Sequence, residues 1–285
     1  MKLLSFNNGA RDTWGALADD GGVCDLGGHF GDTMPTLRAC LEGGDAAMKK
    51  VARYMKGRKG EFSAKRVKYL PTITNPDKVI CIGLNYRKHA AETGSKLPAN
   101  PMIFPRWTDS HVGHGQAMLR PKESKMFDFE GELAVVIGKT CRRVSKSQAL
   151  KYVGGYTIYN DGSIRDFQRH TSQFAPGKNF HKSGSFGPWM TTADEIPDPA
   201  KLHLTTRLNG KVVQDEGVDD LIFNVPELIS YCSSFMELVP GDTIVTGTPS
   251  GVGLARTPQL WMKPGDTIEI EISQIGVLSN PIKAG

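Results

Sequence analysis

Residues 128–138 read Asp128-Phe129-Glu130-Gly131-Glu132-Leu133-Ala134-Val135-Val136-Ile137-Gly138 and place acidic side chains directly before a hydrophobic run. Residues 133–137 are apolar, β-branched at three of five positions and followed by a glycine, which predicts a buried strand rather than a helix. Side chains alternate between the two faces of a strand, so Glu130 and Glu132 point to the same side. Two carboxylates held together beside a hydrophobic core repel each other unless a cation or protons compensate their charge. The segment therefore indicates a site for a hard divalent cation with oxygen ligands, although paired acids also occur on solvated edge strands.

A third acid, Asp161, ends another expected strand. It follows Tyr-Thr-Ile-Tyr at residues 156–159 and lies in Asn160-Asp161-Gly162, where the end of a strand exposes functional groups. An aspartate in such a turn also often hydrogen bonds to its own backbone. Together, Glu130, Glu132 and Asp161 form an oxygen-only ligand set without a nearby Cys or His, which suits Mg²⁺, Mn²⁺ or Ca²⁺ and disfavours zinc.

A candidate acid–base pair lies upstream of these acids. Residues 85–92, Asn-Tyr-Arg-Lys-His-Ala-Ala-Glu, predict a short helix that Asn85 caps and that ends before Gly94. His89 and Glu92 are three residues apart and share a helix face. A carboxylate beside an imidazole fixes the tautomer of the ring and raises its basicity, which is the arrangement needed to activate water. The alternative is a solvent-exposed pair on a surface helix.

The composition is typical of a globular protein, with 39% hydrophobic and 23% charged residues. The net charge of +5 comes without a basic stripe interleaved with aromatic residues, which argues against nucleic-acid binding and suits a small anionic substrate. The five cysteines are widely spaced and form no Cys-x-x-Cys pair, so free thiols are expected. The first residues show no signal-peptide pattern, and no apolar run approaches the ~18 residues of a membrane span. We therefore expect a cytoplasmic protein that has no membrane partner.

Strand and turn signals divide the chain into two regions. Residues 1–70 are expected to form a small N-terminal domain of short strands and one helix over residues 45–55, capped by Asp45. This domain contains no acid–base constellation, so we expect it to serve packing or dimer contacts. Residues 71–285 are expected to form the catalytic domain.

The second region is rich in strand signals. Asn209-Gly210 separates two β runs and predicts a hairpin, and Pro-Gly-Asp-Thr at residues 240–243 and 264–267 predicts type II turns that open strands. Helices are expected only at residues 85–93, 145–152 and 226–235. The fold class that these elements predict is α+β, predominantly β.

Six segments of the second region, taken in order, resemble the fumarylacetoacetate hydrolase family. They are residues 83–92, 128–138, 160–166, 177–180, 187–189 and 246–253. The resemblance covers roughly residues 76–280 and implies a mixed β-sandwich roll with a few flanking helices, beside the small N-terminal domain. It also implies a bound Mg²⁺ or Mn²⁺ and a homodimer.

The same resemblance assigns individual residues. It implies that Glu130, Glu132 and Asp161 bind the metal and that His89 and Glu92 are the water-activating dyad. Lys178 is implied as a catalytic residue that offsets developing negative charge. Substrate contacts are implied for Arg165, Gln168 and Thr248.

The first hypothesis for the function is a metal-dependent hydrolase that cleaves a C–C bond in a 2,4-dioxo acid. Such acylpyruvate-like or fumarylacetoacetate-like substrates arise in aromatic or sugar catabolism, and His89 would deprotonate the attacking water. The family also includes decarboxylases and isomerases, so an oxaloacetate-type decarboxylase or a 2-hydroxymuconate-type isomerase is the alternative. A non-catalytic, metal-stabilised module is a third hypothesis. Two departures from the family pattern, a short loop between Asp161 and Lys178 and a histidine at position 181, bear on the choice of substrate.

Overall fold

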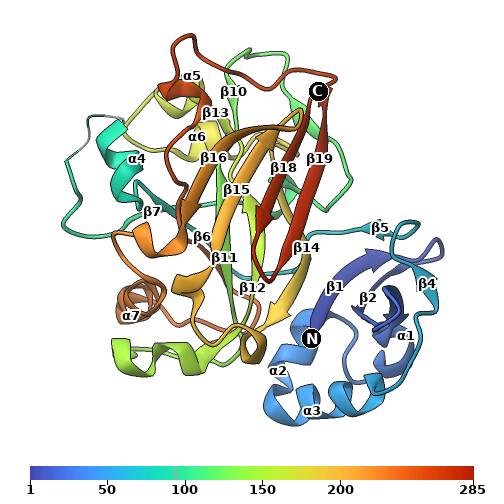
Figure 1. Ribbon diagram of the computed structural model, residues 1–285. Helices are drawn as coiled ribbons and strands as arrows, with labels where there is room; N and C mark the ends of the chain where they lie inside the picture. Colours follow the sequence, from blue (N-terminus) through green and yellow to red (C-terminus); the bar gives the residue numbers. More distant parts are fainter. Residues whose placement is uncertain (93, 95) are drawn as a thin grey trace.

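A twelve-stranded mixed sheet forms the larger part of the fold (Figure 1), and the computed structural model describes residues 1–92, 94 and 96–285. Its strands are β1 (Lys2–Asn7), β2 (Asp12–Leu17), β3 (Gly22–Asp25), β4 (Phe62–Ser63), β5 (Lys68–Tyr69), β6 (Val79–Gly83), β7 (Met102–Pro105), β8 (His111–Val112), β11 (Gly131–Ile137), β12 (Val153–Asn160), β14 (Gly184–Thr192) and β17 (Thr243–Val245). Their hydrogen-bonded order is β4-β3-β2-β1-β14-β12-β11-β17-β6-β7, with β5 beside β1 and β8 beside β14. The pairs β17–β6 and β14–β8 are parallel, and the pairs that flank β11 are antiparallel.

A second sheet of five strands completes the sandwich. Its strands are β9 (Met118–Arg120), β15 (His203–Leu208), β16 (Lys211–Gly217), β18 (Thr267–Ile272) and β19 (Gly276–Ala284), in the order β16-β15-β18-β19-β9. The hairpin predicted at Asn209-Gly210 is confirmed, because Leu208 of β15 pairs with Lys211 of β16. Two short strands, β10 (Phe127–Asp128) and β13 (Ser163–Ile164), pair with each other beside the predicted acidic residues.

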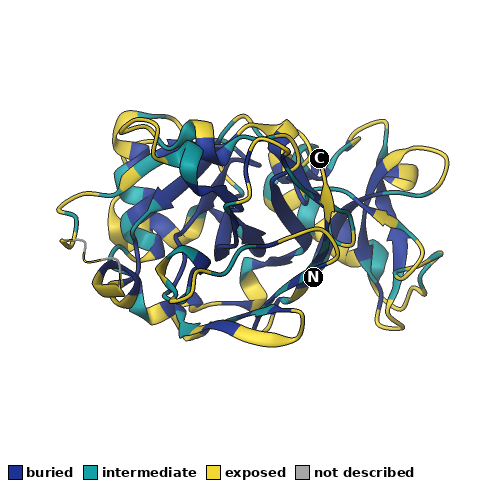
Figure 2. Ribbon diagram, turned by 90° about the horizontal axis from the view of Figure 1, so that it is seen from above, coloured by how far each residue is buried: buried dark blue, intermediate teal, exposed yellow. Residues whose placement is uncertain are grey.

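Strand β11 is buried on both faces, which explains why its sequence is an unbroken apolar run rather than an alternating one. Leu133, Val135 and Ile137 belong to a core shared with β15 and β18 of the second sheet and with α7 (Val225–Phe235). Ala134 and Val136 belong to a second core that includes residues of the N-terminal helices. Figure 2 shows these central strands in dark blue, with exposed loops around them.

The fold is α+β and predominantly β, as the sequence predicts, although the helices at residues 26–30, 37–42, 165–168 and 175–178 were not predicted. The α-helices of the described chain are α1 (Leu26–Phe30), α2 (Leu37–Glu42), α3 (Gly44–Met55), α4 (Arg87–Glu92), α5 (Arg165–Gln168), α6 (Ala175–Lys178) and α7. Short 3₁₀ segments cover Thr108–Ser110, Lys146–Tyr152, Ala193–Glu195, Pro199–Lys201, Val218–Asp220 and Gly253–Ala255. The prediction of an α-helix at residues 145–152 is therefore wrong in type, since this segment is a 3₁₀ helix.

Two predicted helix caps are also wrong. Helix α3 begins after Gly43 without a side-chain cap, and Asp45 lies within its first turn. Asn85 does not cap α4, because its amide donates to the carbonyl groups of Phe223 (3.0 Å) and Thr246 (2.8 Å). This asparagine instead ties together loops that are distant in sequence. Position 93, the expected end of that helix, lies outside the described residues.

The N-terminal region and the rest of the chain share one sheet. Strands β1–β4 and helices α1–α3, blue in Figure 1, lie to one side of the central strands. Strand β1 pairs with β14 through Lys2–Thr191 and Leu3–Met190, so the sheet continues from one region into the other. The division into residues 1–70 and 71–285 remains a prediction.

Two further expectations concern the whole chain. All five cysteines are buried and unpaired, as expected. None of the helices within the described residues is long and apolar enough to cross a membrane.

Candidate metal centre and active site

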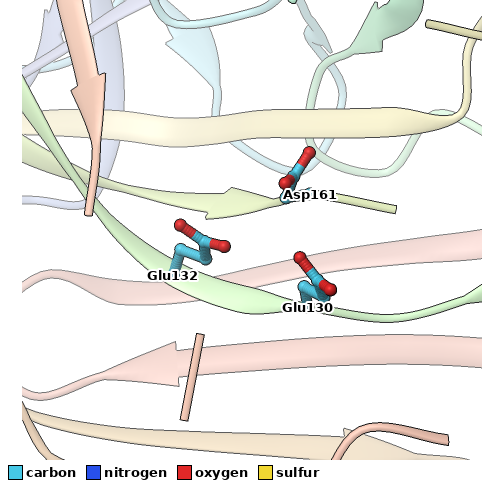
Figure 3. Close-up of side chains that lie close together, drawn as sticks. All are labelled: Glu130, Glu132 and Asp161. Atoms are coloured by element: carbon cyan, nitrogen blue, oxygen red, sulfur yellow. The ribbon is translucent and has the colours of Figure 1, made fainter. Parts of the chain in front are cut away.

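Strand pairing brings the three predicted metal ligands together. Gly131 of β11 pairs with Asn160 of β12, so Asp161 comes to lie beside Glu130, and its backbone N–H donates to the Glu130 carbonyl at 2.9 Å. Glu132 lies on β11 and Glu130 directly precedes that strand, and both side chains extend toward Asp161 (Figure 3). Each of the three side chains is buried, and each offers a carboxylate oxygen within 4.8 Å of the others.

Three buried cations surround these acids in a chain of ion pairs. Lys178 Nζ lies 2.7 Å from Glu130 Oε2 and 2.6 Å from Asp161 Oδ2. Arg106 Nη1 donates to the other oxygen of Asp161 at 2.7 Å. Arg165 bridges Glu130 (2.7 Å) and Asp128 (2.8 Å).

Glu132 is outside this chain of ion pairs. The hydrogen bond recorded for its carboxylate comes from the backbone N–H of Gly247, at 2.5 Å. Counted with Asp128, the cluster holds four buried carboxylates and three buried cations, which leaves one negative charge in excess when all are ionised.

The pKa shifts follow from these contacts. Burial by itself raises the pKa of Glu130, but Lys178 and Arg165 outweigh that effect and lower it to about 2. Burial, and then the charges of Asp161 and Glu130, raise the pKa of Glu132 well above its ordinary value. Burial by itself lowers the pKa of Lys178, but Asp161 and Glu130 reverse this, so the ammonium group stays charged.

This environment fits a hard divalent cation. The donor set consists of carboxylate oxygens, the ligands that Mg²⁺ and Mn²⁺ prefer. Burial and the charges of Asp161 and Glu130 raise the pKa of the Glu132 carboxyl more than Lys178 lowers it, and a divalent cation would relieve this repulsion. The residues present are therefore compatible with the metal site that the sequence predicts.

The predicted dyad is assembled on α4. His89 is buried, and its Nδ1 lies 2.7 Å from Glu92 Oε1. The two carboxylate oxygens of Glu92 also accept the backbone N–H of Gly251, at 3.1 and 2.9 Å. Because Glu92 contacts both the ring and the loop at residues 246–253, it fixes the orientation of the imidazole. The imidazole of His89 is thus buried, whereas Glu92 remains exposed, so only the histidine departs from the solvent-exposed pair that the sequence left open.

A cavity of about 230 Å³ joins the dyad to the acids. It is lined by Ile82, Gly83, Leu84, His89, Phe104, Glu130, Glu132, Arg165, Gln168, Arg169, Phe174, Lys178, Thr248, Val252 and Leu254. Asp161 and Glu92 are not in this lining but contact residues that are, namely Lys178 and His89. His181, which the sequence suggested as a determinant of substrate choice, is exposed and does not line the cavity.

The three residues predicted to bind substrate also line this cavity. Arg165 Nη1 donates to Gln168 Oε1 at 2.9 Å, and Arg165 Nη2 is buried without a hydrogen-bond partner among the described residues. Thr248 Oγ1 donates to the Gly131 carbonyl at 3.0 Å and accepts the amide of Gln214 at 2.8 Å. Arg165 is therefore the residue of this group with an uncommitted buried donor.

Sequence reasoning missed three residues that hold the site together. Asp128 accepts hydrogen bonds from Arg165 and from the backbone N–H of Gly253 (2.7 Å). Because Asp128 is the first residue of the acidic segment 128–138, the sequence contained a signal for it. Gln214 Oε1 accepts the N–H of Gly131 at 3.0 Å, between the two glutamates. Arg106 belongs to no motif, so only the folded chain places it against Asp161.

Comparisons with known proteins agree with this fold and site. The family model described as fumarylacetoacetate (FAA) hydrolase C-terminal matches residues 78–283. Oxaloacetate tautomerase Fahd2a, mitochondrial, from Rattus norvegicus is 39% identical over 264 residues, which are 92% of this chain and 84% of the rat protein.

Solved structures extend the likeness to the whole chain. A 5-carboxymethyl-2-hydroxymuconate delta-isomerase from Mycobacterium smegmatis has a TM-score of 0.78 and 30% identity, and the match covers 100% of this chain and 99% of that one. Maleylpyruvate hydrolase from Sphingobium sp. SYK-6, solved with manganese (II) ion and pyruvate, has a TM-score of 0.84 and 26% identity, with 100% of both chains covered. These matches confirm the sandwich-roll fold with its N-terminal portion.

Proposed function

Since the chain belongs to the fumarylacetoacetate hydrolase family, we propose that it is a metal-dependent tautomerase that interconverts the keto and enol forms of a small 2-oxo acid. This reaction belongs to the isomerase alternative that the sequence left open, and it replaces C–C hydrolysis as the first hypothesis. The rat relative that is 39% identical is an oxaloacetate tautomerase, which supports the choice. The cavity of about 230 Å³ also favours a small acid, since pockets for drug-sized ligands measure roughly 300–1,000 Å³.

The observation that carries the proposal is the His89–Glu92 pair, 2.7 Å apart, on the same cavity as the acidic cluster. Glu130, Glu132 and Asp161 would hold Mg²⁺ or Mn²⁺. When bound there, the cation would act as a Lewis acid that polarises the 2-oxo group of the substrate. His89 would remove a proton from the carbon beside that group and return it in the reverse direction.

The other residues assist this proton transfer. The electron pair left on carbon would move to the 2-oxo oxygen, and the protonated His89 would give its proton to that oxygen, directly or through water, which completes the enol and restores the neutral imidazole. Glu92 would stabilise the protonated imidazole, because Nδ1 lies beside its carboxylate. Lys178 and Arg165 would offset the negative charge that develops on the oxygen, as both line the cavity with their charges. Gln168 and Thr248 would contact the substrate from the same lining.

Hydrolysis of a C–C bond in a 2,4-dioxo acid is the second candidate. The likeness to maleylpyruvate hydrolase favours it, with a TM-score of 0.84 over the whole chain. The same dyad could deprotonate a water molecule instead of a carbon acid. An oxaloacetate-type decarboxylase would share the metal and the stabilised enolate, and it would release CO₂.

A panel of substrates separates these reactions. The purified protein would be assayed with Mg²⁺, with Mn²⁺ and with EDTA on enol-oxaloacetate, on acylpyruvates and on 2-hydroxymuconate-type acids. We expect metal-dependent loss of the enol absorbance of oxaloacetate with no CO₂ and no cleavage product. Two acid products from an acylpyruvate, formed at a much higher kcat/KM, would replace the tautomerase by the hydrolase, and CO₂ would indicate the decarboxylase.

Substitution of the dyad tests the residue assignment. His89→Ala should lower kcat by roughly 10²–10⁴-fold while metal affinity is retained, because removal of a general base has that effect. Glu92→Gln should lower it less, since a hydrogen bond to the ring is kept. His203→Ala is the control, because this histidine is exposed and does not line the cavity. Full activity in His89→Ala would remove the histidine from the mechanism.

The remaining expectations belong to the same proposal. We propose a homodimer with a small anionic substrate and no nucleic-acid or membrane partner, and light scattering would measure its mass in solution. A cytoplasmic location also stays a proposal, and the rat relative is described as mitochondrial. No residue of 1–70 is among those that line the cavity, in keeping with a packing or dimer function for that region.

A further inference from the structure

Arg169 is a cationic residue of the cavity lining that lies outside the chain of buried ion pairs. Lys178, Arg165 and Arg169 all line the cavity. Lys178 and Arg165 are buried and bonded to the carboxylates of the acidic cluster. Arg169 is exposed, and within the described chain no ion pair is recorded for it. Its charge is therefore available to an anionic group that enters the cavity.

The local backbone holds Arg169 beside the inner part of the site. Arg169 directly follows α5, and its N–H donates to the Asp166 carbonyl at 3.2 Å, which continues the helical turn. Arg165 is the first residue of α5 and Arg169 caps its C-terminal end, and both residues line the cavity. The wall of the cavity thus carries a buried guanidinium, that of Arg165, and an exposed one, that of Arg169.

The charge of the buried cluster limits what it can bind. When all of them are ionised, its four carboxylates and three cations leave one negative charge, and a divalent cation would change this to one positive charge. One positive charge matches the single carboxylate beside the 2-oxo group of any 2-oxo acid. A second substrate carboxylate would need a further cation, and Arg169 is the cavity-lining residue that supplies one.

We propose that Arg169 is a specificity-determining residue that binds the second carboxylate of a dicarboxylic 2-oxo acid. The enzyme would then prefer dicarboxylates to monocarboxylates of the same length. This inference rests on the proposed function, in that it places a 2-oxo acid in this cavity. It does not depend on which reaction follows binding.

The matched probes are oxaloacetate and 2-oxobutyrate, which share the 2-oxo acid end and differ in a terminal carboxylate or methyl group. Binding of each would be measured by calorimetry and by thermal shift, in Mg²⁺ and in EDTA, for the wild type, Arg169→Gln, Arg169→Lys and Arg142→Gln. Arg142 is the control, because it is exposed and does not line the cavity.

We expect the wild type to bind oxaloacetate more tightly, and Arg169→Gln to weaken that binding roughly ten- to hundredfold, the range for hydrogen bonds to charged groups. Binding of 2-oxobutyrate and of Mg²⁺ should stay within about twofold of the wild type, because neither contacts Arg169. Arg169→Lys should restore part of the preference, and Arg142→Gln should behave as the wild type. KM for oxaloacetate should follow its Kd in each variant.

Equal losses for both acids in Arg169→Gln, or no loss for oxaloacetate, would overturn the inference. A preference for the dicarboxylate that depends on Arg169, without any tautomerisation, would support the inference and overturn the proposed reaction. Tautomerisation without a preference for the dicarboxylate would support the proposed reaction and overturn the inference on Arg169. Failure of the wild type to bind either acid would overturn both.

Discussion

Lys178→Met removes the cation at the centre of the acidic cluster while keeping a side chain of similar length. The Nζ atom of Lys178 lies 2.7 Å from Glu130 and 2.6 Å from Asp161, and the lysine side chain is 2% exposed. Loss of one partner from a buried ion pair destabilises a protein by about 3–5 kcal/mol, because the remaining charge is buried without compensation. Here Glu130 keeps its ion pair with Arg165 and Asp161 keeps its ion pair with Arg106, so we expect a loss at the lower end of that range, about 3 kcal/mol.

The expected change in melting temperature follows from the size of the chain. With an unfolding entropy of about 2.1 cal/mol/K per residue, 1 kcal/mol corresponds to roughly 1.7 °C for a chain of 285 residues, so Tm in EDTA should fall by roughly 5 °C. A bound divalent cation would compensate the same carboxylates. Mg²⁺ or Mn²⁺ should therefore raise Tm more in Lys178→Met than in the wild type, while activity stays low.

Scanning calorimetry of the two proteins, with and without metal, measures both effects. Lys139→Met is the matched control, because Lys139 pairs with Asp45 at 2.9 Å on the surface, where the two side chains are 48% and 70% exposed. An exposed pair of this kind contributes about 0–1 kcal/mol. If Lys178→Met in EDTA were as stable as Lys139→Met, the ion pairs of Lys178 with Glu130 and Asp161 would contribute no more to stability than an exposed pair, and the reasoning would be refuted.

Three further predictions concern the strand that carries the glutamates. Burial and neighbouring acids raise the pKa of Glu132 above its ordinary 4.5, so its contribution to the stability of the metal-free protein is present below that pH and is lost as pH rises through the folded pKa. The gain in Tm on adding Mg²⁺ should thus increase with pH, and a gain independent of pH would contradict this. Glu132→Ala should abolish calorimetric metal binding and metal-dependent activity in a folded protein, and an unchanged titration would show that the site is elsewhere. Gly131→Ala should destabilise the protein by about 1–3 kcal/mol in chemical unfolding, because the added Cβ would lie 2.3 Å from Thr206 Oγ1. Adding Thr206→Ala should recover most of that loss, and a lack of recovery would exclude this contact as the cause.

Local sequence patterns were sufficient to predict some of the strands and turns and several of their properties, although strands such as β14 and β19 were not predicted. The apolar run after Glu132 predicted a strand, and the period of two residues predicted that Glu130 and Glu132 share a face. The turns at Asn209-Gly210 and before residues 242 and 266 also agree with the structure, in which Gly241 and Gly265 have φ of +90° and +96°. Each of these signals acts between residues that are close in sequence, so a short segment is sufficient to predict the strand or turn that it forms.

Helix caps were less predictable, although they are local features. Asn85 has the side chain of a good cap, yet it bonds to loops 138 and 161 residues away. The same polar group satisfies either a helix terminus or a distant carbonyl group, and tertiary packing selects between them. The pair of His89 and Glu92 was recognisable because its two members are only three residues apart. The partners of Asn85, by contrast, are far from it in the sequence.

The sequence by itself thus determined the predominantly β class, the strands next to the acidic residues, the hairpin at Asn209-Gly210 and the oxygen-only donor set of the candidate metal site. Only the tertiary structure decided how their charge is balanced. The pairing of β11 with β12 brings Asp161 to Glu130, and Arg106 reaches Asp161 across 55 residues of sequence. No local pattern marks such an arginine, because its charge is stabilised by groups that meet only when the sheet forms. The cavity and its uncommitted Arg169 depend on the same long-range packing, because a binding site consists of surfaces from segments that are separate in the chain.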